Sequence, residues 1–195
     1  MQIFSSQLMF ATDDLHKTIE YTVPGTYTFK LSRRTRAKLW MVGGGACRTI
    51  SYSRYTGYWY YPGSGGAAFV GSVYLPAGIY SVVVGNSIEG PQTSDSYGWM
   101  KTGTSEDSIL SNNISGTLLN AGGCHELGAN GKLTISANLE IQYGTVEVES
   151  DGNMATFNSG DPGAASLYDG WGRGGDGVAN VENDNHTTGY FKIEY

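Results

Sequence analysis

"LWMVGGGAC" (residues 39–47) joins an apolar run directly to three glycines and a cysteine. Positions 39–42 are all apolar, which predicts a central strand with both faces buried. "LLNAGGCHE" (118–126) repeats the order of apolar run, glycine pair and cysteine. Because glycine has no Cβ, two such segments can approach backbone to backbone, so we expect 43–45 to pack against 120–123. The glycines to which we assign this structural role are Gly43, Gly44, Gly45, Gly122 and Gly123.

The composition describes an ordered, acidic chain. Glycine accounts for 29 of 195 residues, about twice its average usage of roughly 7%. Disordered segments are poor in aromatics and rich in charge, whereas this chain has 12% aromatic and 15% charged residues. Its net charge of −6 argues against a nucleic-acid partner, because such binding depends on clustered cations. We interpret the one basic cluster, "RRTRAK" (33–38), as a solvated strand face or turn rather than an anion site.

Alternating apolar residues predict strands along most of the chain. "EYTVPGTYTFKL" (20–31) is typical of a hairpin-like pair of strands with its turn at Pro24–Gly25, and 67–86 repeats this arrangement around a Pro-Ala-Gly turn. No segment shows a helical stripe. We therefore predict an all-β fold, a jelly-roll-like β-sandwich with glycine-rich loops. The other strands are expected within 108–114, 116–121, 132–143, 145–150 and 189–195.

Nothing in the sequence predicts catalysis or a cofactor. "GWGRGG" (170–175) has the spacing of a dinucleotide-binding loop, but no amphipathic helix follows it. The acidic residues between 89 and 107 lie in loop-like sequence without apolar shelter to raise a carboxyl pKa. We therefore expect no catalytic residue, no cofactor and no metal. The alternative is a calcium ion held by Asp169, Asp176, Glu182 and Asp184, although their spacing matches no calcium loop.

Cys47 and Cys124 leave two alternatives open. Cysteines in a reducing cytosol remain thiols, but both follow glycine pairs, so a bond could form if the two segments lie side by side. No apolar run approaches the ~20 residues that span a bilayer. The N-terminus also lacks the basic and apolar regions of a signal peptide. We therefore expect no membrane insertion.

An aromatic block lies between two glycine-rich runs, in "SYSRYTGYWYYPGSGG" (51–66). Mixtures of tyrosine, serine and glycine are typical of recognition loops, in which rigid rings supply contact area. Aromatic faces also stack on the C–H surfaces of sugar rings. Packing of the same rings on glycine backbone inside the domain is the alternative, and the two interpretations are compatible. The residues expected to bind a receptor are Tyr55, Tyr58, Trp59, Tyr60, Tyr61 and Trp171.

The order of motifs from residue 20 onward resembles a known family. "PGTYTFKLSRRTRAKLWMVGGGA", "GSGGAAFVGSVYLPAGIYSVVVGN", "LLNAGGC" and "TTGYFKIEY" follow one another as in the glycine-rich C-terminal domain of phage tail-fibre and receptor-binding proteins, which also occurs in bacterial surface proteins. The resemblance implies a β-sandwich over 20–195 that carries recognition loops, has no catalytic residues and assembles as a homotrimer. The glycine runs here are interrupted and short, which argues against a tightly packed polyglycine array.

The sequence and the resemblance together lead to one functional expectation. The chain is expected to be a non-enzymatic receptor-binding or adhesin domain of a phage tail fibre that recognises a bacterial surface glycan. Residues 1–19 are assigned to attachment or to oligomer contacts, and other virion tail proteins are expected partners. The alternatives are a virion structural protein, a protein of the bacterial cell surface, and a polysaccharide-degrading enzyme, which would need two carboxylates about 5–10 Å apart.

Overall fold

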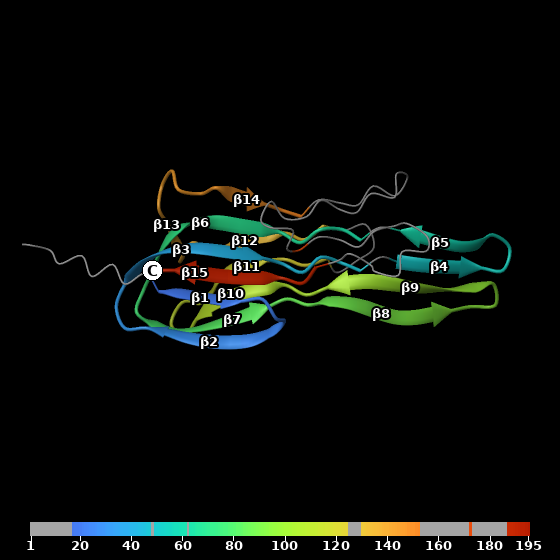
Figure 1. Ribbon diagram of the computed structural model, residues 1–195, viewed down its shortest axis with the longest axis horizontal. Helices are drawn as coiled ribbons and strands as arrows, with labels where there is room; N and C mark the ends of the chain where they lie inside the picture. Colours follow the sequence, from blue (N-terminus) through green and yellow to red (C-terminus); the bar gives the residue numbers. More distant parts are fainter. Residues whose placement is uncertain (1–16, 48, 62, 125–129, 153–171, 173–186) are drawn as a thin grey trace, which may run out of the picture.

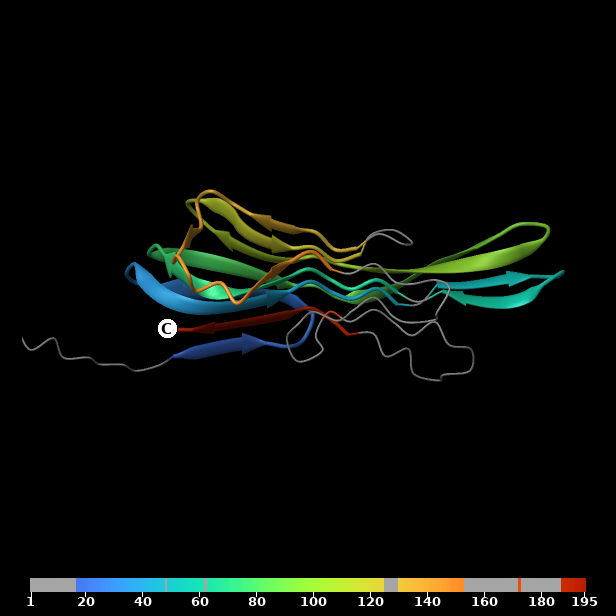
Figure 2. The same cartoon turned by 90° about the horizontal axis from the view of Figure 1, so that it is seen from above.

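Every element of the described chain is a β-strand, in fifteen strands arranged as three antiparallel sheets. The computed structural model describes residues 17–47, 49–61, 63–124, 130–152, 172 and 187–195, and within them all side chains except those of residues 60 and 91. Sheets A and B pack face to face, and sheet C extends from one end of this pair (Figures 1 and 2). The predicted all-β sandwich is confirmed. Sheet C is an addition to the expected two-sheet arrangement.

Sheet A contains the strand formed by the apolar run at residues 39–42. β3 lies between β15 and β6, so the prediction of a central strand at residues 39–42 is confirmed. The edge strand β1 begins at residue 18 and pairs with β15, so the sandwich starts two residues before the expected boundary at residue 20. The strands of sheet A are β1 (Thr18–Tyr21), β3 (Thr35–Val42), β6 (Ala68–Leu75), β13 (Glu140–Ile141), β14 (Val148–Ser150) and β15 (Tyr190–Glu194).

Sheet B has the order β12-β11-β10-β7-β2. Its strands are β2 (Gly25–Leu31), β7 (Gly78–Val84), β10 (Ser108–Asn112), β11 (Gly116–Ala121) and β12 (Leu133–Ile135). The predicted hairpin at 20–31 is wrong, because β1 pairs with β15 in sheet A while β2 pairs with β7 in sheet B. The similar unit at 67–86 also divides, with β6 in sheet A and β7 in sheet B. In both units the proline-containing connection crosses from one sheet to the other.

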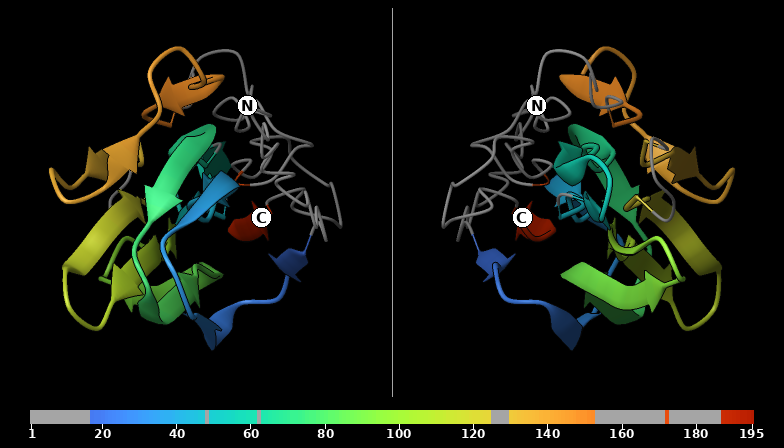
Figure 3. Two further views of the ribbon diagram at one scale, coloured as in Figure 1. Left: turned by 90° about the vertical axis from the view of Figure 1, so that its left-hand side faces the viewer. Right: turned by 90° about the vertical axis from the view of Figure 1, so that its right-hand side faces the viewer.

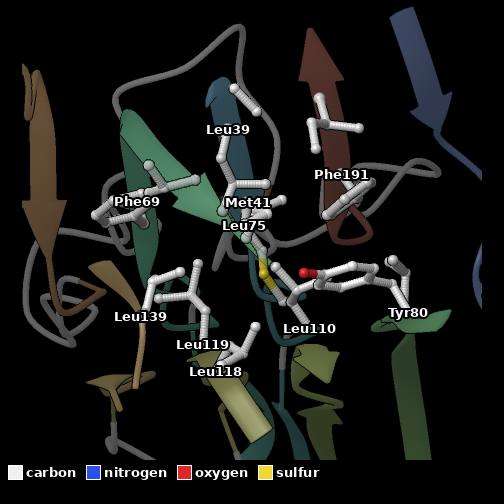
Figure 4. Close-up of a cluster of buried hydrophobic side chains, with 14 of the residues drawn as sticks. Leu39, Met41, Phe69, Leu75, Tyr80, Leu110, Leu118, Leu119, Leu139 and Phe191 are labelled. Atoms are coloured by element: carbon white, nitrogen blue, oxygen red, sulfur yellow. The ribbon is translucent and has the colours of Figure 1, made fainter. Parts of the chain in front are cut away.

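The core lies between sheets A and B. Alternation along β3 directs Leu39 and Met41 into it, where they are fully buried. Phe69 and Phe191 contribute from the other strands of sheet A. Tyr80 contributes the largest fully buried side chain from sheet B, and its hydroxyl donates to the carbonyl of residue 76 at 2.6 Å. Figure 4 shows these side chains converging from both sheets.

Sheet C has the order β5-β4-β9-β8 and lies beyond the end of the sandwich (Figure 1). Its strands are β4 (Thr49–Ser53), β5 (Gly57–Tyr61), β8 (Ser87–Ser94) and β9 (Gly98–Ser105). The interpretation of 89–107 as loop-like is therefore wrong for most of its length, and the aromatic block that was expected to form a recognition loop lies largely in β4 and β5. These strands carry few aliphatic side chains, so the alternation of apolar and polar residues that marks a buried strand is weak in them.

Four connections run between the sandwich and sheet C, and glycines make their close packing possible. The segments 43–47, 63–67, 85–86 and 106–107 link β3 to β4, β5 to β6, β7 to β8 and β9 to β10. The segments 122–124 and 187–189 lie among them. A Cβ added at Gly44 would meet the carbonyl oxygen of residue 86 at 2.7 Å, and one at Gly122 would meet that of Lys132 at 2.6 Å. We call this region the glycine junction.

Backbone hydrogen bonds in the glycine junction follow a three-residue period. The first and fourth N–H groups of 43–46 donate to the same neighbouring segment, 63–67, while the second and third donate to two other segments. Three residues per turn is the repeat of a polyproline II helix, whose N–H groups point outward in three directions. Although the glycine runs are interrupted, the segments that contain them approach one another backbone to backbone. The four acceptors, in order, are the carbonyl oxygens of Ala67, Glu106, Thr187 and Ser64.

The two cysteines lie buried in this junction as free thiols. The Cys47 sulfur lies 3.3 Å from the Ser87 hydroxyl, and the Cys124 thiol donates to the carbonyl of Gly65 at 3.2 Å. Of the two alternatives left open by the sequence, the structure contains the thiols. Burial raises the pKa of Cys124 to about 11, although nearby hydrogen bonds act in the opposite direction.

Figure 3 shows the sandwich and sheet C along the axis that joins them.

We predict that Gly122→Ala strongly destabilises the chain. The new methyl group would lie 2.6 Å from the carbonyl oxygen of Lys132 and 2.8 Å from its nitrogen, and backbone atoms cannot swing away as a side chain can. Overpacking of this kind costs about 3 kcal/mol of stability. The loss in the free energy of unfolding is measured by urea denaturation. Gly57→Ala is the control, because its φ of +80° is strained for alanine but open space surrounds it. That strain costs about 1 kcal/mol. Equal stability losses in the two variants would contradict close packing as the cause.

We also predict a pH dependence of stability that depends on Cys124. Its pKa in the folded chain, about 11, exceeds the ordinary value of 9.0. The thiol therefore favours the folded state below pH 9, and this contribution disappears as the pH rises toward 11, by about 3 kcal/mol in total. The measurement is the free energy of unfolding against pH under reducing conditions. Cys124→Ala should lose less stability across this interval than the natural chain, and parallel curves would refute the assignment.

Candidate functional site

Sheet C presents a concentration of exposed aromatic and apolar side chains. Half of the large hydrophobic residues exposed in the described chain belong to its strands and turns. Their exposed fractions range from 38% at Met100 to 75% at Tyr55. Contiguous exposed apolar surface on a soluble protein marks an interaction site. The five residues are Tyr55, Tyr58, Trp59, Tyr97 and Met100.

One face of sheet C carries a row of three aromatic rings. Tyr58 of β5 lies opposite Tyr52 of β4, which in turn lies opposite Trp99 of β9. Residues directly opposite each other share a face of the sheet. The Tyr52 ring lies 4.9 Å from that of Tyr58 and 6.2 Å from that of Trp99, measured between centroids. The row is therefore a contiguous aromatic surface across three strands.

The opposite face carries Trp59. Strand alternation places Trp59, its partner Ser51 and the next residue across, Met100, on this side. The indole Nε1 of Trp59 donates to the Thr56 hydroxyl at 3.0 Å, and half of the side chain is exposed. The hydrogen bond restrains the ring while its face remains open to solvent. Trp59 is thus neither a core residue nor a freely rotating one.

The tips of the two hairpins are joined. The rings of Tyr55 and Tyr97 lie 6.3 Å apart, and the N–H of Arg54 donates to the carbonyl of Tyr97 at 3.1 Å. The β8–β9 turn is fixed by the Asp95 carboxylate, which accepts from the N–H groups of Tyr97 at 2.7 Å and Gly98 at 2.9 Å. Such side chain-to-backbone bonds stabilise a turn locally. The tip tyrosines therefore extend the aromatic surface from an ordered support.

A hollow of about 460 Å³ lies over β4, β8 and β9. Among its lining side chains, Ser51, Thr93 and Met100 share the face of Trp59. Asp95 is the one carboxylate among the described residues that line it. The hollow therefore offers hydroxyl groups and little charge on the Trp59 face. Its lining consists of Ser51, Tyr52, Ser53, Thr93, Ser94, Asp95, Tyr97, Gly98, Trp99 and Met100.

The predicted receptor-binding residues are only partly brought together. Tyr55, Tyr58 and Trp59 are exposed on sheet C, and Tyr61 is half-buried at the sandwich end of β5. Tyr60 belongs to β5, but only its backbone is described. Trp171 lies outside the described residues. Tyr97, Trp99, Met100 and Tyr52 lie on sheet C but are not among the residues predicted from the sequence. The one signal for the first three was the short cluster "YGWM" (97–100).

Neither a cluster of metal-binding side chains nor a helix that could span a membrane occurs among the described residues. No group of three or more histidine, cysteine, aspartate or glutamate side chains there could hold a metal ion. The carboxylates considered for calcium (169, 176, 182 and 184) and most of "GWGRGG" lie outside that part. On sheet C, Lys101 forms an ion pair with Glu89. No described helix is long and apolar enough to cross a bilayer.

The chain was compared with models of protein families, with curated protein sequences and with solved structures, and no match was found in any of the three.

Proposed function

We propose that this chain is a non-enzymatic receptor-binding domain that recognises a bacterial surface glycan through sheet C. One observation carries the proposal. Sheet C exposes aromatic rings on both of its faces and at its tips, away from the core of the sandwich. Rings that do not stabilise the fold cost solubility, so their exposure is best explained by a ligand that covers them.

The chemistry of the surface favours a sugar. Tyrosine and tryptophan faces stack on the apolar C–H faces of pyranose rings, and Tyr52, Tyr58 and Trp99 together offer aromatic surface on one face of sheet C. On the opposite face, beside Trp59, the hollow offers serine and threonine hydroxyls, which both donate and accept hydrogen bonds. With Asp95 as its charged group, the hollow suits a neutral glycan better than a phosphorylated or sialylated one.

Binding without cleavage accords with the carboxylates of sheet C. Glycoside hydrolysis uses two carboxyl groups that flank the scissile bond. Among the described residues of the hollow, Asp95 supplies one, and one of its oxygens accepts two turn N–H groups. Glu89 is engaged by Lys101. A paired acid and base would therefore have to come from elsewhere.

The biological setting is proposed from the motif resemblance. We place the domain at the tip of a phage tail fibre, with display on a bacterial cell surface as the alternative. Assembly as a homotrimer with other virion tail proteins belongs to the same proposal. Several copies of a weak sugar site on one assembly would raise the effective affinity by orders of magnitude.

Trp59→Ala and Tyr58→Ala test the proposal from the two faces of sheet C. Labelled protein is titrated onto a panel of bacterial strains and onto their extracted polysaccharides. Loss of a central aromatic contact costs about 2 kcal/mol, which corresponds to about 30-fold weaker binding. Tyr143→Ala is the matched control, because that tyrosine is fully exposed, at 101%, in the turn between β13 and β14 rather than on sheet C. The control should bind as the natural chain does.

Melting temperature and oligomeric state are measured on every variant. If both sheet C variants bind normally, the aromatic surface is not the receptor site. If they unfold or dissociate while their folded fraction still binds, the rings are structural. If the natural chain releases reducing sugar and Asp95→Asn does not, the chain is a hydrolase and the proposal of binding without cleavage is wrong.

A further inference from the structure

A basic groove lies at the end of the sandwich away from sheet C. Its volume is about 1,020 Å³, and it is formed by the connection from β2 to β3, by the beginning of β3 and by the paired backbone of residues 17 and 195. In Figure 1 this end carries the C-terminus, and sheet C lies at the other end. The basic cluster "RRTRAK" does form a turn and a strand start, as expected, but two further lysines from elsewhere in the chain join it.

The groove concentrates positive charge in an acidic chain. Six of the twelve lysines and arginines of the sequence line it, although the net charge of the whole chain is −6. The one acidic side chain in the lining is Glu194, which forms an ion pair with Lys192 at 2.7 Å. The six cations are Lys17, Lys30, Arg33, Arg34, Arg36 and Lys38.

Two of these cations are neutralised and four are not. Arg34 binds both oxygens of Glu140, at 2.6 and 2.7 Å, and Lys38 binds Glu147 at 2.6 Å. The other four side chains are exposed and have no acidic partner among the residues that the structure describes. Unbalanced like charges repel one another, so an anionic partner would relieve this repulsion. The four are Lys17, Lys30, Arg33 and Arg36.

The backbone that supports the groove is ordered. The Thr35 hydroxyl donates to the carbonyl of Arg33 at 2.9 Å, which restrains the turn. The backbone of Lys17 exchanges two hydrogen bonds with Tyr195, at 2.7 and 2.9 Å. Leu31 and Ala37 also line the groove, but their side chains are buried in the core of the sandwich. A ligand therefore meets exposed cations carried on an ordered backbone.

We propose that this groove binds an extended acidic segment of a partner protein, whose carboxylates meet the four cations that have no acidic partner among the described residues. Complementary charge between partners steers association and suppresses wrong pairings. A long phosphate polymer fits less well, because beyond the groove it would run along the surface of a chain with an excess of six negative charges. The inference goes beyond the proposed glycan recognition, since the two surfaces lie at opposite ends and can be occupied together.

Fluorescence anisotropy with a labelled Glu-Glu-Leu repeat peptide tests the proposal at low salt. The natural chain should bind this peptide saturably and should not bind the corresponding Lys-Lys-Leu peptide. Arg33→Glu/Arg36→Glu should weaken the affinity about tenfold or more. Arg54→Glu/Lys132→Glu is the matched control, because it changes the net charge by the same amount at exposed positions outside the groove. The control should remain within about twofold of the natural chain.

Lys17→Gln/Lys30→Gln is a second, milder pair in case charge reversal unfolds the chain, and it should also weaken peptide binding. Absence of peptide binding by the natural chain would overturn the proposal. Equal losses of peptide affinity in the groove variant and the control variant would also overturn it, because the net charge of the chain would then explain the binding. Tighter binding of an oligothymidylate than of the peptide would assign the groove to phosphate polymers instead. Normal glycan binding by the groove variants would show that the two surfaces are independent.

Discussion

Close approach of backbones in the glycine junction is the constraint on which the rest of the molecule depends. Sheet C has no large core of its own, and its position relative to the sandwich depends on four connections that pass through a narrow region. Side chains at Gly44 or Gly122 would occupy the space of neighbouring carbonyl groups. The sandwich and sheet C are therefore joined by backbone hydrogen bonds between adjacent segments rather than by packed side chains. The glycine content of the sequence is the chemical requirement for this arrangement.

The molecule separates its stabilising and its exposed aromatic residues. Phe29 and Tyr80 stack at 4.9 Å inside the sandwich, where burial of apolar area stabilises the fold. The rings of sheet C contact mainly each other and solvent. The charges are distributed unevenly as well, because four cations that have no acidic partner among the described residues line the groove at the opposite end. The two ends of the molecule therefore present chemically distinct surfaces, one aromatic and one basic.

The sequence predicted a strand most reliably where both faces of that strand are buried. The apolar run of β3 identified a central strand because both of its faces are buried, and the glycines after it identified the junction. Local patterns could not reveal pairing partners, so Pro24–Gly25 looked like a hairpin turn although it joins two sheets. β8 and β9 were missed because both are rich in polar residues and lack a regular apolar alternation. As a consequence Trp99 was not associated with Tyr52, 47 residues earlier, until the register placed them opposite each other.

The period of three in the glycine junction has a consequence for backbone dynamics. Irregular segments between strands ordinarily exchange their amide hydrogens with solvent quickly. The amides of Gly43, Gly44 and Gly45 are buried and each is bonded to a different segment, so none can open unless several neighbours move together. We therefore expect these amides to exchange only when several connections open together. A segment without regular secondary structure would then exchange as slowly as a buried strand.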